Sequence, residues 1–315
     1  MEEIYFLRPL FLEKIWGGTR LNERFGYGIP EGINKQKVGE AWGVSGHRSG
    51  KNIIANGQYE GMNLDDLWKK HPHLFGEDGS RQDFPLQLRL VDAQSDLSIQ
   101  VHPYEEYAMA HENEHGKSEA WYVIECLPEA KLVYGSSART KSELRNMVSK
   151  GEWDELICRK SIKPGDFVYV PPGMMHAINE GTMVLEVAEC SDVTYRFYDY
   201  DRVDTDGNHR PLHVEKAMDV LTVPTDKVEL ATKTIDYTDA RHEILLENEY
   251  FYISKLTVAG KAAVTKDKPF YACFVLDGNG TIFDYAIKKG DFFIIPSSYN
   301  TLETEGNFEL IAAYA

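Results

Sequence analysis

The chain has 315 residues, of which 43% are hydrophobic and 27% charged, as in an ordinary globular protein. Its formal net charge of −16 at pH 7 argues against a broad basic face for nucleic acid or an anionic membrane, but not against a small anionic substrate. The four cysteines have no paired spacing, and the sequence shows neither a signal-peptide pattern nor a membrane span, so we expect a cytoplasmic protein with reduced thiols.

Most of the chain is expected to form short strands separated by turns. In chain order, the strands are predicted at 84–91, 97–101, 120–125, 131–134, 167–170, 183–187 and 194–198. Helices are predicted to begin at Asn63, with two acids in the first turn, and at Thr140, which forms a capping box with Glu143. The second of these helices is expected to end at Gly151. A third helix is expected over 212–221. The fold class is therefore expected to be mainly β.

A ten-residue block occurs twice. Residues 162–171, Ile-Lys-Pro-Gly-Asp-Phe-Val-Tyr-Val-Pro, are repeated at 287–296 as Ile-Lys-Lys-Gly-Asp-Phe-Phe-Ile-Ile-Pro. The shared turn and strand chemistry predicts two similar β-rich units, an N-terminal domain over 1–230 and a C-terminal domain over 231–315. His176 in the first copy aligns with Thr301 in the second. The second unit is therefore expected to lack this imidazole and to bind no metal.

Three short stretches supply side chains that can ligate a metal. Gln100 and His102 are two apart on an alternating strand and share one face, Glu119 directly precedes a strand, and His176 follows a strand and a Pro-Pro-Gly turn. One such histidine alone is more often not a ligand, but two imidazoles with a carboxylate form a set for a divalent transition metal. A position left open is typical of a catalytic metal.

Three basic residues lie close to these stretches in sequence. Lys117 is two residues before Glu119, Arg196 lies on a strand after His176, and Arg89 lies on the strand before Gln100. Most lysines and arginines are solvated surface cations. Arg196 is the exception to expect, because aromatic residues surround it in sequence and a buried arginine needs an anionic partner. A phosphate or an enediolate would be such a partner.

The spacing of Gly165, Pro171, Gly173 and His176 matches the second motif of the cupin barrels. Beyond this, the sequence resembles the class I mannose-6-phosphate isomerases of the short bacterial kind over nearly its whole length. The motifs that carry the resemblance are Ile15-Trp16-Gly17-Gly18, Gly39-Glu40-Ala41-Trp42-Gly43, Leu97-Ser98-Ile99-Gln100-Val101-His102-Pro103, Gly116-Lys117-Ser118-Glu119-Ala120-Trp121-Tyr122 and Tyr195-Arg196-Phe197-Tyr198-Asp199-Tyr200-Asp201-Arg202.

The resemblance implies two cupin-type (jelly-roll) β-barrels with a few added helices. It implies a zinc-dependent aldose–ketose isomerase with one zinc ion per chain, which interconverts mannose 6-phosphate and fructose 6-phosphate through an enediolate. The family's zinc ligands fall on His102, Glu119 and His176, with Gln100 a ligand in some members. Its essential arginine falls on Arg196.

Further site residues follow from the same resemblance. The site lysine of the family falls on Lys117, and other polar site residues fall on Glu186 and Asp192. Lys117 and Glu186 are both candidates for the proton carrier. Arg89 stands where relatives carry lysine and is expected to contact the substrate. Trp16 is expected either to pack against the sugar or to belong to the core. The chain lacks the long helical insertion of the eukaryotic members.

Two other functions fit parts of the sequence. Two histidines and one carboxylate are also the ligand set of non-haem iron dioxygenases, some of which are cupins. A non-catalytic sugar-phosphate-binding cupin is the third reading. The Gln-X-His pair and the lysine beside Glu119 argue against the dioxygenase, and the complete set of ligands with Arg196 and Lys117 argues against a protein that has lost its activity. The sequence predicts no particular oligomeric state.

Overall fold

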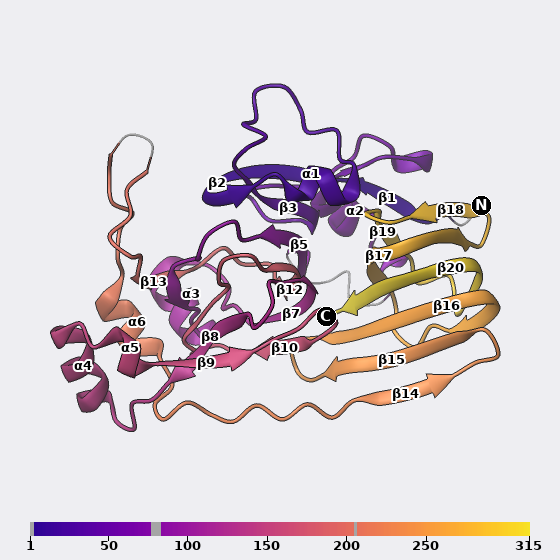
Figure 1. The fold of residues 1–315 in the computed structure, drawn as a ribbon. Coiled ribbons are helices and arrows are strands. Elements are labelled where there is room, and N and C mark those ends of the chain that lie inside the picture. Colours follow the sequence, from indigo (N-terminus) through magenta and orange to yellow (C-terminus); the bar gives the residue numbers. More distant parts are fainter. Residues whose placement is uncertain (1–2, 77–82, 205–206) are drawn as a thin grey trace. The chain divides into compact units, whose positions relative to one another are not determined.

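The structure is a computed structural model that describes residues 3–76, 83–204 and 207–315. It is mainly β, with a few short helices (Figure 1). The chain divides into two compact units. We call them the C-terminal unit (Met1–Leu10, Ala41–Arg89 and Glu229–Ala315) and the central unit (Phe11–Glu40 and Leu90–Val228). In the described part of the chain, no helix is both long and apolar enough to cross a membrane.

The C-terminal unit is built on one nine-stranded sheet. Its order is β14-β15-β16-β20-β17-β19-β1-β4, with β18 paired to β17. These strands are β1 Tyr5–Arg8, β4 Ile53–Ile54, β14 Lys233–Asp236, β15 Ala240–Glu247, β16 Tyr252–Thr265, β17 Tyr271–Ile282, β18 Tyr285–Lys288, β19 Phe292–Ile295 and β20 Thr301–Tyr314. The long strands β16, β20 and β17 run side by side (Figure 1). Buried and exposed residues alternate along β15, as expected for a strand with one face on the core.

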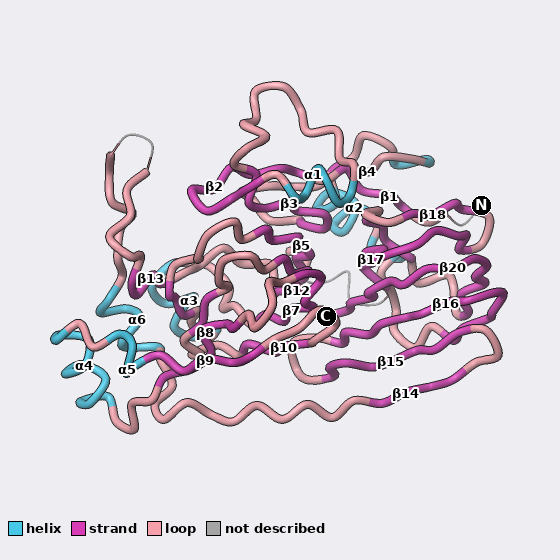
Figure 2. The backbone as a smooth tube through the Cα atoms, in the orientation of Figure 1, coloured by secondary structure: helices cyan, strands magenta, loops and turns pink. Residues whose placement is uncertain are grey.

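The central unit holds a five-stranded sheet of order β13-β6-β11-β8-β9. Its strands are β6 Ile99–Val101, β8 Lys131–Ser136, β9 Ile157–Ser161, β11 His176–Ala177 and β13 Tyr195–Tyr198. One face packs on the helices α4 Lys141–Lys150, α5 Trp153–Leu156 and α6 Val214–Val220, which gather beside this sheet (Figure 2). The other face shares an apolar cluster with strands of a second sheet, so the central unit has an interior between two sheets.

That second sheet has the order β10-β7-β12-β5-β3-β2. Its strands are β2 Leu10–Gly18, β3 Val38–Ser45, β5 Leu86–Asp92, β7 Glu119–Glu125, β10 Phe167–Val170 and β12 Met183–Glu189. The mainly β fold predicted from the sequence is confirmed. Among the described residues, however, each sheet keeps unpaired edge strands, so the sheets form open jelly-roll layers and not continuously closed barrels.

The helices with clear capping signals were predicted well. In α2 Leu64–Lys70 the Asn63 side chain accepts a hydrogen bond from the backbone of Asp66, and in α4 Thr140 accepts one from the backbone of Glu143. The predicted third helix is α6. The helices α1 Arg20–Phe25, α3 Glu105–Glu112 and α5 Trp153–Leu156 were not predicted, because none begins with a capping side chain. His111 lies exposed in the last turn of α3.

The repeated block forms the same turn in both units. The backbone N–H of Lys163 donates to Asp166 Oδ2 over 2.9 Å, and the N–H of Lys288 donates to Asp291 Oδ2 over 2.9 Å. The glycine before each aspartate has a φ of 89° and 91°, respectively, in the left-handed region that favours glycine. The sequence repeat therefore predicted a repeated local structure.

The strands that follow these turns also pair in the same register. Val170 of β10 lies opposite Glu119 of β7, and Ile295 of β19 lies opposite Tyr271 of β17. Since Val170 and Ile295 occupy the same place in the repeat, Tyr271 stands in the C-terminal unit at the position that Glu119 has in the central unit.

Candidate metal centre

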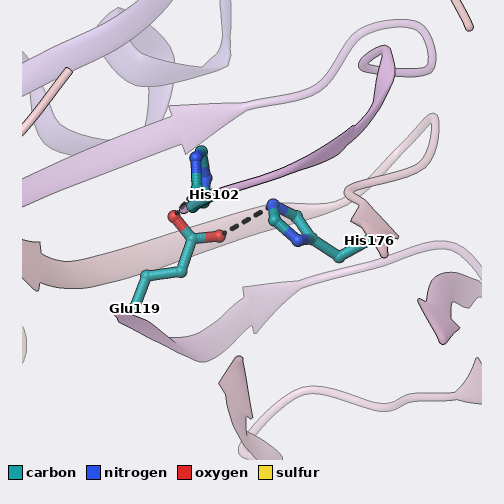
Figure 3. A group of neighbouring side chains, drawn as sticks. All are labelled: His102, Glu119 and His176. Carbon is teal, nitrogen blue, oxygen red and sulfur yellow. Dashed lines mark ion pairs between the residues drawn. The ribbon is translucent and has the colours of Figure 1, made fainter. Parts of the chain in front are cut away.

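Three of the predicted ligands meet in the interior of the central unit. His102 Nε2 lies 3.2 Å from Glu119 Oε2, and His176 Nε2 lies 3.3 Å from Glu119 Oε1. The carboxylate faces both imidazole rings (Figure 3). All three side chains are at most 2% exposed, and their ligand atoms lie within 4.8 Å of one another. The prediction that these residues come together is confirmed.

Backbone contacts fix the orientation of both imidazoles. His102 Nδ1 lies 2.7 Å from the carbonyl oxygen of Val193, and His176 Nδ1 lies 2.8 Å from that of Met174. A carbonyl can only accept, so each Nδ1 carries the proton and each Nε2 presents a lone pair. Metal-ligating histidines are held in this way, with the second nitrogen bonded to a carbonyl or carboxylate.

Two imidazoles with free lone pairs, His102 and His176, and the ionised carboxylate of Glu119 face one another at the centre. Burial, helped by the charge of Lys117, lowers the pKa of His102 to about 3, and burial also lowers the pKa of His176. Burial alone would raise the pKa of Glu119, but the neighbouring charges, that of Lys117 first, hold it well below its usual range. Among the described residues, His102 Nε2 and Glu119 Oε1 have no hydrogen-bond partner, and Glu119 Oε2 has an ion pair with Lys117. Orphaned lone pairs of this kind fit a bound cation.

Gln100 lies at the edge of this group. Its Nε2 is 3.5 Å from His176 Nε2, and its Oε1 accepts a hydrogen bond from the Ser98 hydroxyl over 3.4 Å. The oxygen and nitrogen of an amide are assigned and not observed. Rotation of the amide by half a turn would place Oε1 toward His176 and the centre, as a metal ligand requires.

A buried lysine adjoins the carboxylate. Lys117 Nζ lies 2.9 Å from Glu119 Oε2 and 3.2 Å from Glu186 Oε1, and the lysine side chain is 1% exposed. Lys117 is therefore not a solvated surface cation. Glu186 lies opposite Trp121 on the neighbouring strand, so its side chain shares the interior face with Glu119, two residues from Trp121.

The side chain of Arg196 projects from the five-stranded sheet toward the same interior. It is half-buried, and its Nη1 donates to the carbonyl oxygen of Pro211 over 2.8 Å. Its buried Nε has no hydrogen-bond partner, and it forms no ion pair with the described residues. Burial, with the charges of Arg210 and Arg202, lowers its pKa. The guanidinium thus keeps an unused donor.

Three further residues, Trp16, Asp192 and Arg89, are expected to contact the substrate. Trp16 is 4% exposed and belongs to the apolar cluster of the central unit, beside Trp121. Asp192 is exposed in the loop between β12 and β13. Arg89 is buried on β5 at the end of a segment of the C-terminal unit. Their contacts with a substrate stay predictions.

Sequence reasoning missed Trp121. Its ring packs against that of His176, with the centroids 5.6 Å apart and the planes at 67°, and its buried indole nitrogen has no hydrogen-bond partner in the described part of the chain. A signal was present in the sequence, because Trp121 is two residues after Glu119 on an alternating strand and must share its face.

The fold and the centre define a cupin-type β protein whose interior can hold one divalent metal ion. Residues 4–125 match the family of type I phosphomannose isomerase catalytic domains, and residues 242–315 match the cupin domain of mannose-6-phosphate isomerases. The chain is 43% identical over 318 residues to mannose-6-phosphate isomerase ManA of Bacillus subtilis, with 99% of each chain covered. It belongs to the type I phosphomannose isomerase family.

Further relatives agree. The mannose-6-phosphate isomerase of Streptococcus mutans is 40% identical over 320 residues, covering 100% of this chain and 99% of the relative. The crystal structure of mannose 6-phosphate isomerase from Bacillus subtilis superimposes with a TM-score of 0.95 at 41% identity, over the whole of both chains. The resemblance noted in the sequence is confirmed, as is the cupin fold.

Proposed function

We propose that this chain is a zinc-dependent aldose–ketose isomerase that interconverts mannose 6-phosphate and fructose 6-phosphate. The observation that carries the proposal is the buried ammonium of Lys117, held between Glu119 of the metal centre and Glu186. An isomerase must move a proton between two adjacent carbons beside a group that polarises the carbonyl. Here a lysine and a second carboxylate adjoin the metal ligands, in a position to carry that proton.

Zinc is the metal we propose, one per chain, held by His102, Glu119 and His176, with Gln100 as a further ligand. The 3.2 and 3.3 Å between carboxylate oxygens and imidazole nitrogens approach the roughly 3.3 Å expected between two neighbouring ligand atoms that would hold one zinc ion. When bound, the ion supplies a Lewis acid that polarises the substrate carbonyl without redox chemistry, an effect worth several kcal/mol.

The side chains around the centre carry the remaining steps. A proton leaves C2 of the aldose and returns to C1 of the ketose, through an enediolate, while a hydroxyl proton moves between the two oxygens. Glu186 can accept the proton from C2 and return it to C1, while the ammonium of Lys117, 3.2 Å from Glu186, can donate a proton to the carbonyl oxygen and recover one from the neighbouring hydroxyl. The unpaired guanidinium donor of Arg196 would stabilise charge on the enediolate oxygens.

The remaining assignments belong to the same proposal. Trp16, Arg89 and Asp192 would contact the sugar phosphate. Residues 1–230 would form the catalytic domain, and residues 231–315 a C-terminal domain without metal ligands. We propose that the protein acts in the cytoplasm, where its free cysteines, Cys126, Cys158, Cys190 and Cys273, stay reduced.

One assay tests the proposal against its alternatives. The full-length protein is given mannose 6-phosphate, and fructose 6-phosphate is measured before chelation, after exhaustive chelation, and after stoichiometric zinc is restored. We expect turnover, its loss and its recovery. Oxygen consumption with restored iron and no isomerisation would instead indicate the dioxygenase. Binding of the sugar phosphate without turnover in the zinc-loaded protein would indicate a binding protein and refute the isomerase.

A further inference from the structure

Ser118 of the central unit is hydrogen-bonded through both its backbone and its side chain, although it is neither a candidate metal ligand nor a candidate catalytic residue. Ser118 lies between Lys117 and Glu119 and is 0% exposed. Its backbone N–H donates to Glu189 Oε2 over 2.7 Å, and its carbonyl accepts from the N–H of Glu189 over 3.1 Å. Its hydroxyl donates to the Tyr169 hydroxyl over 3.0 Å. We call Ser118, Glu189 and Tyr169 the serine clamp.

The clamp acts on the far side of the strand from the metal centre. The side chains of Lys117 and Glu119 meet at 2.9 Å, so they lie on one side of the chain. The side chain of Ser118, between them, points to the other side, where it meets Tyr169. The Ser118 and Tyr169 hydroxyls therefore meet on the side of the strand away from the candidate ligand atoms. The clamp fixes the backbone from which both functional side chains extend.

The C-terminal unit repeats the strands but not the clamp. Because Tyr271 stands at the position of Glu119, Phe270 stands at that of Ser118. Tyr169 pairs with Ala120, and Ile294 pairs with Ala272, the equivalent of Ala120. Ile294 therefore stands at the position of Tyr169.

The third member is absent there as well. Glu186 pairs with Trp121 in the central unit as Ala312 pairs with Cys273 in the C-terminal unit, so Glu186 and Ala312 are equivalent. Three residues further along each strand, Ala315 therefore stands at the position of Glu189. All three polar residues of the clamp thus have apolar counterparts in the unit that also lacks the metal ligands. A clamp required only by the strand pairing would be needed in both units.

We propose that Glu189 is a positioning residue, which through the backbone of Ser118 holds Lys117 and Glu119 in the geometry that the metal and the proton transfer require. The part of this inference that concerns turnover rests on the proposed function, and the part that concerns the metal does not. A carboxylate that accepts a backbone N–H forms a charge-assisted bond, stronger than a neutral one. Without it, the buried N–H of Ser118 has no partner and the strand can shift to find one.

The test compares two substitutions of the same residue in the full-length protein. Glu189→Leu keeps the approximate size and removes the acceptor, whereas Glu189→Gln keeps an acceptor. We expect Glu189→Leu to weaken zinc binding, measured by competition with a chelator, and to lower kcat, each by about 10- to 100-fold. KM should change little, because Glu189 does not face the substrate. Glu189→Gln should recover most of both losses.

Asp166→Ala is the matched control. It removes a carboxylate–backbone bond of similar length, 2.9 Å to the N–H of Lys163, in a turn of the same unit. It should lower the melting temperature without changing zinc affinity or kcat.

Three outcomes would overturn the inference. The first is a Glu189→Leu protein with a lower melting temperature but wild-type zinc affinity and kcat, since Glu189 would then be structural only. The second is a Glu189→Gln protein as impaired as Glu189→Leu, since the acceptor would not be the cause. The third is an equal loss of zinc affinity in Asp166→Ala. If the wild-type protein has no isomerase activity, the proposed function fails, and the zinc affinities of the three variants still decide the role of Glu189.

Discussion

Arg196 of β13 lies directly opposite Gln100 of β6. Gln100 in turn lies opposite His176 of β11, so the three residues form one row across the five-stranded sheet. Residues paired in this way project from the same face of a sheet. Arg196 is therefore directed to the face that carries the metal ligands, and its buried Nε has no partner there. The position and the unused donor suggest that it acts on the reacting atoms.

We expect Arg196→Lys to lower kcat by about 30- to 1,000-fold, the equivalent of roughly 2–4 kcal/mol, with a smaller change in KM. Lysine keeps the charge but loses the planar fork of donors, so the substitution tests geometry more than charge. Steady-state kinetics with mannose 6-phosphate measures the effect. Zinc content should be unchanged, because a guanidinium does not ligate the metal.

Two results would reassign Arg196. An increase in KM at constant kcat would show that it holds the phosphate and does not stabilise the transition state. Wild-type turnover in the folded variant would show that its bond to the Pro211 carbonyl is its whole role.

The metal centre gives the second prediction. We expect His102→Ala and His176→Ala each to abolish both metal binding and turnover, because each removes one of the two imidazole ligands of the metal. The metal content of the purified proteins, measured by elemental analysis, should fall from one ion per chain to near zero. Full activity of the wild-type protein after exhaustive chelation would contradict a catalytic metal.

The C-terminal unit gives the third. Tyr271, at the position of Glu119, donates a hydrogen bond to Asp267 in the loop between β16 and β17, and Thr301 stands at the position of His176. We expect no metal in this unit, so that a crystal structure with anomalous scattering data shows one metal per chain. Tyr271→Phe should lower the free energy of unfolding by only about 0.5–1.5 kcal/mol, since Asp267 is exposed and water can replace the lost phenol, and it should leave the metal content unchanged. A second metal in this unit would refute the prediction.

The sequence was sufficient to predict the ligands but not what holds them. His102, Glu119 and His176 stand in short motifs with strand alternation, and alternation would also have placed Trp121 on their face. Glu189 could not be found in this way. Its bond to Ser118 joins residues 71 apart in sequence and depends on the register of β12 against β7, which local patterns do not determine.

Other misses have local causes. The N-cap residue of helix α3 is Tyr104, whose side chain makes no capping hydrogen bond, so the sequence there has no start signal. The open edges of the sheets were missed because closure depends on pairing between distant strands, whereas the motifs predict only the strands themselves.

The last prediction concerns His242, in the core of the C-terminal unit. Its side chain is buried, with a residue exposure of 4%, and its Nε2 lies 3.4 Å from the hydroxyl of Tyr252. Its Nδ1 has no hydrogen-bond partner among the residues that the structure describes. Burial lowers its pKa, although the charge of Asp267 opposes this. In the unfolded chain the imidazole titrates near 6.5. As the pH falls below about 6.5, the unfolded state therefore binds a proton that the folded state resists, and stability decreases.

We expect His242→Gln to remove this contribution. Urea unfolding of the metal-free proteins between pH 7.5 and 5 should show a flatter dependence of the unfolding free energy on pH, by up to about 1.4 kcal/mol per pH unit, the value for one proton. Ser254→Ala, which alters a buried residue that cannot titrate, should change the stability but keep the wild-type slope. Equal slopes in the wild-type and His242→Gln proteins would mean that the folded interior accepts the proton as readily as water does. The buried imidazole would then have to gain a partner on protonation, and the orphaned Nδ1 is where such a partner would have to bind.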